Sequence, residues 1–131
     1  GSGNYVAPVG EWVNLEKVIT PVSNNSPAAA DDKILNLEAL SAGKIPKGAK
    51  AVDVNLRASN SSVTTAQGVS VLTVSTQTDG GVKCNPIVND ISQTASGVVP
   101  CDSNGDVYQL ITEAGATLSG YYLDVKRVQV N

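Results

Sequence analysis

Within residues 51–58, apolar and polar side chains alternate from Val52 onward, and this pattern limits the fold more than any other feature of the chain. The apolar positions are Val52, Val54, Leu56 and Ala58, and a polar residue separates each from the next. Successive side chains of a β-strand point to opposite faces, so such a segment buries one face and exposes the other. The alternation therefore predicts a half-buried strand.

Five other segments have the composition or the alternation of strands. They are residues 12–19, 62–65, 69–76, 107–112 and 121–130. The alternation changes phase within 69–76 and 121–130, which is typical of a β-bulge; residues 69–76 also fit a strand that is covered on both faces. Glycine and proline turns separate the segments, and short strands with frequent turns predict an all-β sandwich or barrel.

Residues 26–43 fit neither the strand nor the helix period. Ser26 and Pro27, followed by acidic residues, are typical of a helix start. Leu35 and Leu37 indicate a strand instead. We expect a loop, a short strand around residues 34–37 and a single turn that ends near Gly43; a longer helix is the alternative.

The chain has the length of one domain, with 131 residues, of which 41% are hydrophobic and 16% charged. Residues 1–3 read as a remnant of cloning, and residues 4–131 are expected to form a single β-sandwich domain. The net charge of −3 offers no basic surface for nucleic acid. No stretch of about 18 apolar residues is present, so we expect no membrane span.

The chain contains no histidine, which excludes the Ser-His-Asp and Cys-His arrangements of nucleophilic catalysis. Its acidic residues are scattered singly on predicted turns and polar strand faces, where a solvated role is the simpler interpretation. We therefore expect no enzymatic activity, no catalytic residues and no cofactor.

Residues 102–106 carry oxygen ligands at alternate positions, as calcium loops do at their start. They lack the later glycine and the bidentate acid of a full calcium loop, and Asn104-Gly105 is also a tight-turn sequence. Two cysteines without a histidine do not complete a tetrahedral zinc site. We expect a turn here and no bound metal.

Cys84 and Cys101 are the two cysteines of the chain. In an oxidising environment a disulfide between them would stabilise the fold by about 3 kcal/mol. Two free thiols are the alternative, because the spacing alone does not place two Cβ atoms within bonding distance. We predict a disulfide between Cys84 and Cys101, with two free thiols as the alternative.

The five aromatic residues of the chain are four tyrosines and one tryptophan. Trp12 lies among apolar neighbours in a predicted strand, which favours a core position. Tyr121 and Tyr122 are consecutive, so on a strand they point to opposite faces and one of them lies outside. That outer tyrosine is the candidate contact surface, for another subunit or for a sugar ring.

Three segments near the N-terminal side and one at the end of the chain resemble β-sandwich domains of tailed-phage virion proteins, of the head-fibre, tail-fibre or decoration type. Residues 11–15 (EWVNL), 35–37 (LNL) and 45–52 (IPKGAKAV) are similar to the family pattern W-x-x-L, L-x-L and V-P-x-G-A-x-A-V, and residues 120–127 (GYYLDVKR) to its final strand. The family usually ends with a glycine and an aromatic residue, where this chain has Val128-Gln129-Val130-Asn131. The resemblance implies a jelly-roll-like sandwich, commonly trimeric, on the virion surface.

The function expected from this resemblance is host attachment or particle stabilisation without catalysis. The expected partners are other copies of the chain in a homotrimer, capsid or tail proteins, or a glycan or protein of the host surface. A carbohydrate-binding or adhesin module of a secreted bacterial protein is the first alternative. A pilin-like subunit is the second, and it predicts a long N-terminal helix.

Overall fold

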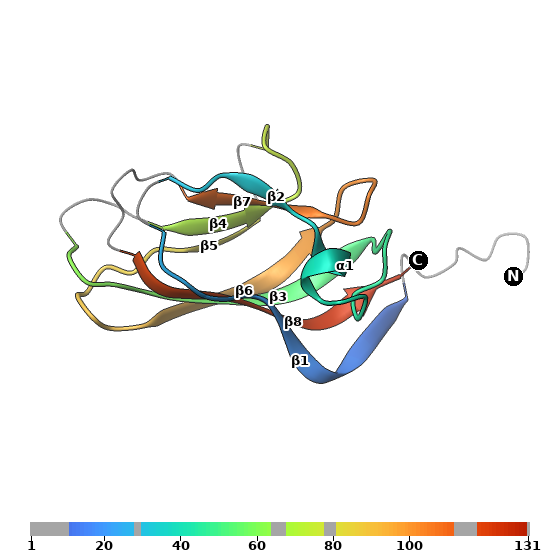
Figure 1. Cartoon of the computed structure of the whole chain (residues 1–131), viewed down its shortest axis with the longest axis horizontal. Coiled ribbons are helices and arrows are strands. Elements are labelled where there is room, and N and C mark those ends of the chain that lie inside the picture. Colours follow the sequence, from blue (N-terminus) through green and yellow to red (C-terminus); the bar gives the residue numbers. More distant parts are fainter. Residues whose placement is uncertain (1–10, 28–29, 64–67, 78–80, 112–117, 131) are drawn as a thin grey trace, which may run out of the picture.

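The protein folds into two antiparallel β-sheets packed face to face, with one short helix beside them (Figure 1). The computed structural model describes residues 11–27, 30–63, 68–77, 81–111 and 118–130. Its elements are β1 (Trp12–Asn25), β2 (Lys33–Leu35), α1 (Leu37–Leu40), β3 (Ala51–Asn60), β4 (Val69–Leu72), β5 (Val82–Cys84), β6 (Gln93–Pro100), β7 (Val107–Ile111) and β8 (Leu118–Gln129).

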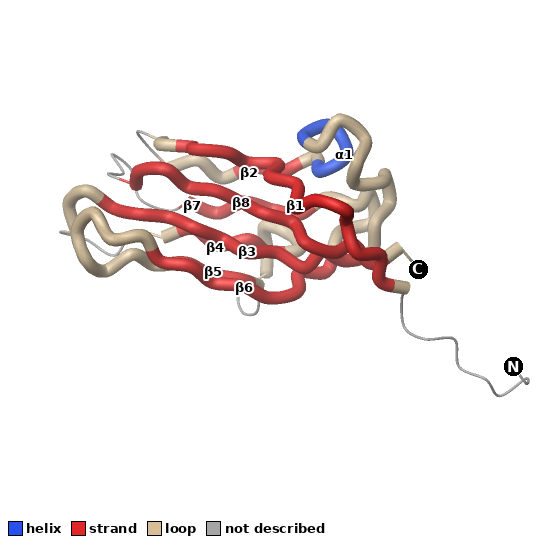
Figure 2. The backbone as a smooth tube through the Cα atoms, turned by 90° about the horizontal axis from the view of Figure 1, so that it is seen from below, coloured by secondary structure: helices blue, strands red, loops and turns tan. Residues whose placement is uncertain are grey.

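The strand order is that of a jelly roll. Sheet A, seen face-on in Figure 2, has the order β1-β8-β3-β6, and sheet B has the order β2-β7-β4-β5. The pairs β1·β8, β2·β7, β3·β6 and β4·β5 are all antiparallel, so the chain is one long antiparallel ribbon rolled into two sheets. The predicted all-β fold, an antiparallel sandwich of the jelly-roll kind, is confirmed.

The core lies between the two sheets. The four apolar positions of the alternating segment 51–58 point into it, and none is more than 1% exposed. All four residues of β4 are buried, as expected for a strand covered on both faces. Burial of these aliphatic side chains is the main favourable contribution to the stability of the sandwich.

The predicted bulge near the end of the chain occurs at Lys126. On β3, Asp53 pairs with Arg127 and the next residue, Val54, pairs with Val125, so Lys126 has no partner in the register. One extra residue shifts the pleat by one position, which is why the apolar alternation changes phase there.

Residues 33–43 form a short strand and a single helical turn, as the sequence predicts. The side chain of Asn36 caps α1 by accepting a hydrogen bond from the backbone N–H of Ala39 at 3.1 Å. Ala42 then has a φ of +54°, the left-handed conformation that ends the helix, and the backbone N–H of Gly43 donates to the backbone oxygen of Glu38 at 2.8 Å. The alternative of a longer helix is wrong for the described part of this region.

Two strand predictions differ from the structure, and two strands are not predicted by the sequence pattern. Of the segment 62–65, Ser62 and Val63 are not in a strand, and residues 64–65 lie outside the described residues. The strand predicted at 69–76 ends at Leu72, because the side chain of Gln77 accepts the backbone N–H of Thr73 at 2.7 Å and a turn begins. Strands β5 and β6 were not predicted: β5 has three residues and β6 contains glycine and ends in proline, as edge strands do.

Candidate functional site

The two consecutive tyrosines of β8 point to opposite faces of sheet A, as predicted. Tyr121 is completely buried between the sheets. Tyr122 lies on the outer face, where its hydroxyl is 3.4 Å from the side-chain oxygen of Asn24. The guanidinium of Arg57, on the neighbouring strand β3, lies 4.2 Å from the centroid of the Tyr122 ring. This is the geometry of a cation–π contact.

Asp124 fixes the guanidinium in that position. One carboxylate oxygen accepts from Nε of Arg57 at 3.0 Å, and the other accepts from the hydroxyl of Thr20 at 2.8 Å and from Nη2 of Arg57 at 3.4 Å. Asp124 is only 8% exposed, whereas the side chain of Arg57 is 44% exposed. Two donors thus satisfy a nearly buried carboxylate, and the outer side of Arg57 stays available to a partner.

A second stack of an aromatic ring, an arginine and an aspartate lies further along sheet A, on β1, β8 and β3. Nε of Arg127 donates to Asp53 at 3.0 Å, and its guanidinium lies 4.7 Å from the centroid of the Trp12 ring. The expected core position of Trp12 is therefore wrong: the ring is half-buried on the outer face of sheet A. Trp12 occupies an edge strand at the end of the sheet, where a guanidinium covers it instead of the opposite sheet.

The two stacks together form a polar and aromatic surface on sheet A, here called the Arg–aromatic face. Because the side chains of positions 53 and 57 are four residues apart on one strand, the stacks repeat at about 13 Å. The face consists of Trp12, Asp53, Arg57, Tyr122, Asp124 and Arg127. Exposed Thr94, Ser96 and Val98 of β6 border it.

The structure does not form the disulfide that the sequence predicts. Sγ of Cys84 lies in the core, 3.3 Å from the backbone oxygen of Gln93 at the start of β6, whereas Cys101 directly follows the other end of that strand. Eight residues of extended chain separate Gln93 from Cys101, or about 26 Å, far beyond the reach of a disulfide. Both thiols are free, which is the alternative that the spacing left open.

Residues 102–106 form the predicted turn. One carboxylate oxygen of Asp102 accepts the backbone N–H groups of Asn104 at 2.8 Å and of Asp106 at 3.0 Å. Gly105 has a φ of +82°. Burial and the nearby charge of Asp102 raise the pKa of Asp106 above its ordinary value. Among the described residues, no group of three or more histidine, cysteine, aspartate or glutamate side chains could hold a metal ion.

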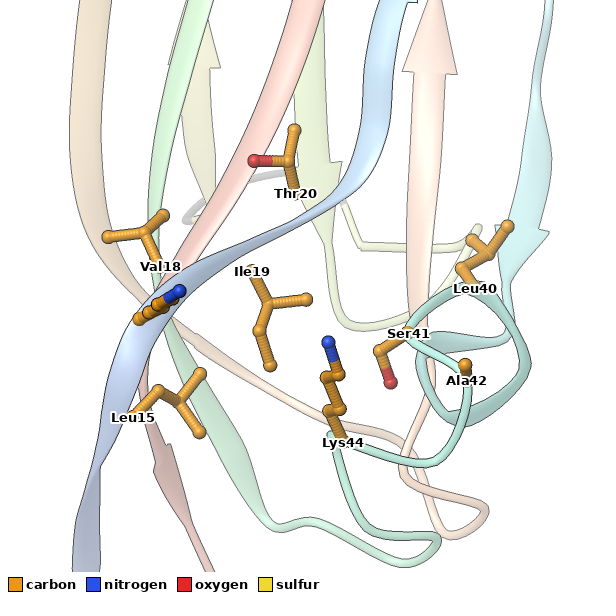
Figure 3. Close-up of a pocket in the computed structure, with 9 residues that line it drawn as sticks. Leu15, Val18, Ile19, Thr20, Leu40, Ser41, Ala42 and Lys44 are labelled. Atoms are coloured by element: carbon orange, nitrogen blue, oxygen red, sulfur yellow. The ribbon is translucent and has the colours of Figure 1, made fainter.

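A groove that no pattern in the sequence predicts runs along β1. One part, about 770 Å³, lies between β1 and the turn after α1, where Leu15 and Ile19 extend toward Ser41 and Lys44 (Figure 3). A second part, about 510 Å³, continues between the end of β1 and β2, and the two parts share Leu40. We call this feature the lysine-rimmed groove, and its lining includes Leu15, Lys17, Val18, Ile19, Lys33, Ile34, Leu40 and Lys44.

The loop between β5 and β6 forms an apolar tip at the end of the sandwich away from α1 (Figure 1). Ile87, Val88 and Ile91 are 69%, 52% and 56% exposed. The backbone of the loop is held to the end of β3, because the N–H of Asp90 donates to the backbone oxygen of Asn60 at 2.8 Å. The tip therefore presents aliphatic side chains from an anchored backbone.

Comparisons with known proteins do not identify the chain. No protein-family model, no curated protein and no solved structure matches it. In the portion of the chain that the structure describes, no helix has the length and apolar character needed to cross a membrane.

Proposed function

We propose that this chain is a non-enzymatic structural domain displayed on the surface of a tailed-phage virion, as a fibre tip or capsid decoration, for host attachment or particle stabilisation. The jelly roll supports the proposal because viral capsid and lectin domains use this architecture. A fold hosts many functions, however, so the surface must carry the argument. The Arg–aromatic face is the observation that does so.

The Arg–aromatic face has the composition of a protein contact. Arginine, tyrosine and tryptophan dominate the binding energy of interfaces, and this face holds all three within two stacks. Carboxylates already hold both guanidinium groups in place, so binding would cost little further side-chain entropy. We assign this face to the contact between subunits of a homotrimer, with Tyr122 and Arg57 at its centre.

Light scattering over a concentration series tests the trimer. The unchanged chain should approach three times its monomer mass by about 1 mM, the range in which weak interfaces form. A variant with Arg57→Glu and Tyr122→Ser should remain a monomer, and Lys83→Glu, on an exposed position of sheet B, should associate as the unchanged chain does. A strictly monomeric unchanged chain at about 1 mM would contradict the trimer.

A carbohydrate-binding module is the second candidate, because the same face also suits sugar. Aromatic rings pack on the apolar sides of pyranose rings. The side chain of Asn24 contacts the hydroxyl of Tyr122, and Thr94 and Ser96 add hydroxyl groups on β6, two strands away from Tyr122. A glycan array with the unchanged chain and with Tyr122→Ala separates the two candidates. Saturable glycan binding by a monomer, lost in Tyr122→Ala, would favour the carbohydrate module over the trimeric virion domain.

A further inference from the structure

The two flanks of the sandwich differ in how they are closed. On the β5/β6 flank, the hydroxyl of Thr73 donates to the backbone oxygen of Pro100 at 2.8 Å, and Sγ of Cys84 bonds the backbone oxygen of Gln93. These contacts join sheet B to the edge of sheet A.

On the opposite flank, β1 and β2 are the end strands of their sheets, and the lysine-rimmed groove lies between them.

The floor of this groove is continuous with the core, and its border is apolar and exposed. Leu15 and Ile19, which line the groove, are partly buried and pack against the hydrophobic core between the two sheets. Val18, Ile34 and Leu40 border the groove with 56%, 62% and 47% of their surface exposed. Three exposed aliphatic side chains on one flank form an apolar surface, and a partner that covers this surface lowers the free energy.

The rim of the groove is basic. Lys17 and Lys44 line the part next to α1 and Lys33 the part next to β2, while no aspartate or glutamate is among the described lining residues. Lys33 lies 3.4 Å from Asp31, but Lys17 and Lys44 form no ion pair with a described side chain. The whole chain has a net charge of −3, so this rim is a local reversal of its charge.

We propose that the lysine-rimmed groove binds an extended segment of a partner protein in which apolar residues alternate with acidic residues. The apolar side chains of the segment would cover Leu15, Ile19 and Leu40, and its carboxylates would meet Lys17 and Lys44. The inference is independent of the proposed function, because none of the six residues of the Arg–aromatic face lines the groove.

The shape of β1 determines the length of the segment and how it binds. The groove follows residues 15–25 of β1, but residues 14–25 pair with only residues 121–127 of β8. The groove is therefore about 20 Å long and matches about six residues of extended chain. The register of β1 against β8 shifts three times, and such bulges interrupt the regular row of backbone groups that an added strand needs. Side-chain contacts and charge, more than a continuous hydrogen-bonded ladder, therefore hold the segment.

Fluorescence anisotropy with two designed peptides tests the proposal. The probe is a fluorescein-labelled peptide of about six residues in which leucine alternates with aspartate, and its matched control has lysine in place of each aspartate. The acidic peptide should bind and the basic peptide should not, and added salt should weaken the binding. The variant Lys17→Glu/Lys44→Glu should bind the acidic peptide about tenfold more weakly, whereas Lys83→Glu, outside the groove, should bind it unchanged.

Backbone amide chemical shifts of the ¹⁵N-labelled protein show where the peptide binds. Shifts confined to residues 15–25 and 33–44 support the proposal, as does weaker binding by Leu40→Ser with an unchanged circular dichroism spectrum. Equal binding of both peptides, or acidic-peptide binding that the two lysine reversals leave unchanged, would overturn it. A self-association that Leu40→Ser abolishes, without peptide binding, would assign the groove to a second copy of the chain and would also overturn it.

Discussion

Arg57 and Tyr122 lie directly opposite each other on β3 and β8, and the guanidinium of Arg57 rests 4.2 Å from the centre of the Tyr122 ring. Asp124 holds the same guanidinium from the side at 3.0 Å. The ring and the carboxylate thus restrict one side chain in two directions, and Arg57 is ordered before any partner arrives.

Replacing Arg57 with leucine should lower the free energy of unfolding by about 1–3 kcal/mol. The change removes the guanidinium from Asp124, which is 8% exposed, and leaves the hydroxyl of Thr20 as a donor to this carboxylate. Lys126→Leu is the matched control, because Lys126 reaches Asp53 only at 3.9 Å from an exposed position. The control should change the free energy by no more than about 0.5 kcal/mol.

Equilibrium urea denaturation measures both variants. Equal losses from Arg57→Leu and Lys126→Leu would show that the contact between Arg57 and Asp124 contributes no more than an ordinary surface ion pair.

The alternation at 51–58 predicted β3 correctly because the burial of a strand depends on a local pattern of period two. Strand β6 was missed for the converse reason: its inward positions include Ala95 and Gly97, which are too small to give a hydrophobic signal. Gly97 is needed there, since a Cβ at this position would lie 3.0 Å from a methyl group of Val82.

The Arg–aromatic face could be predicted only in part. That one of Tyr121 and Tyr122 lies outside follows from the sequence, since consecutive strand residues face opposite ways. The contact between Arg57 and Asp124 joins positions 67 residues apart and depends on the register of β3 against β8. The disulfide prediction failed for the same reason, because the spacing of Cys84 and Cys101 does not reveal that an entire strand separates them.

The two cysteines should be free thiols in the purified protein. After denaturation without a reductant, iodoacetamide should add to both Cys84 and Cys101, which intact mass spectrometry detects as two labels. In the native protein both should react slowly, because Cys84 is 2% exposed and because burial raises the pKa of the Cys101 thiol to about 12; the thiolate is the reactive form. A mass without labels after denaturation would restore the disulfide.

The stability of the protein should fall at alkaline pH, in part through Cys101. Burial, and then the charges of Asp102 and Asp106, raise its pKa to about 12, whereas an unfolded thiol ionises near pH 8.5. Because the folded state holds the proton more tightly, the stability from this group is complete below about pH 8.5 and is lost as the pH rises toward about 12.

Cys101→Ala should therefore lose less unfolding free energy than the unchanged chain between about pH 9 and 11. Denaturation curves at a series of pH values make this comparison. Burial also raises the pKa of Tyr121. This group lowers the stability of both proteins equally at alkaline pH, so it does not contribute to the difference between them. Parallel pH profiles for the two proteins would show that Cys101 has no part in the alkaline loss.

Tyr121→Phe should leave the free energy of unfolding unchanged or raise it slightly. The ring fills the core, but the buried hydroxyl of Tyr121 has no hydrogen-bond partner among the described residues, and an unsatisfied buried hydroxyl costs about 1–3 kcal/mol. Tyr122→Phe is the control on the outer face, where the hydroxyl meets Asn24. Urea denaturation of Tyr121→Phe that shows a loss of more than about 1 kcal/mol would mean that the hydroxyl is satisfied in solution.

Gly105→Ala should destabilise the protein much more than Gly43→Ala, although both glycines have a φ of +82°. The backbone conformation alone costs an alanine about 1 kcal/mol at either position. At Gly43 an added Cβ meets nothing within 4 Å, whereas at Gly105 it would lie 2.5 Å from the backbone nitrogen of Gly48 and 2.8 Å from that of Ala49. Because these neighbours are backbone atoms, the turn at 102–106 must move away from residues 48–49 in Gly105→Ala. Overpacking of this kind costs about 1–3 kcal/mol more. Thermal denaturation of the two variants side by side separates the steric cost from the conformational one, and equal midpoints would show that the two turns are not packed together in solution.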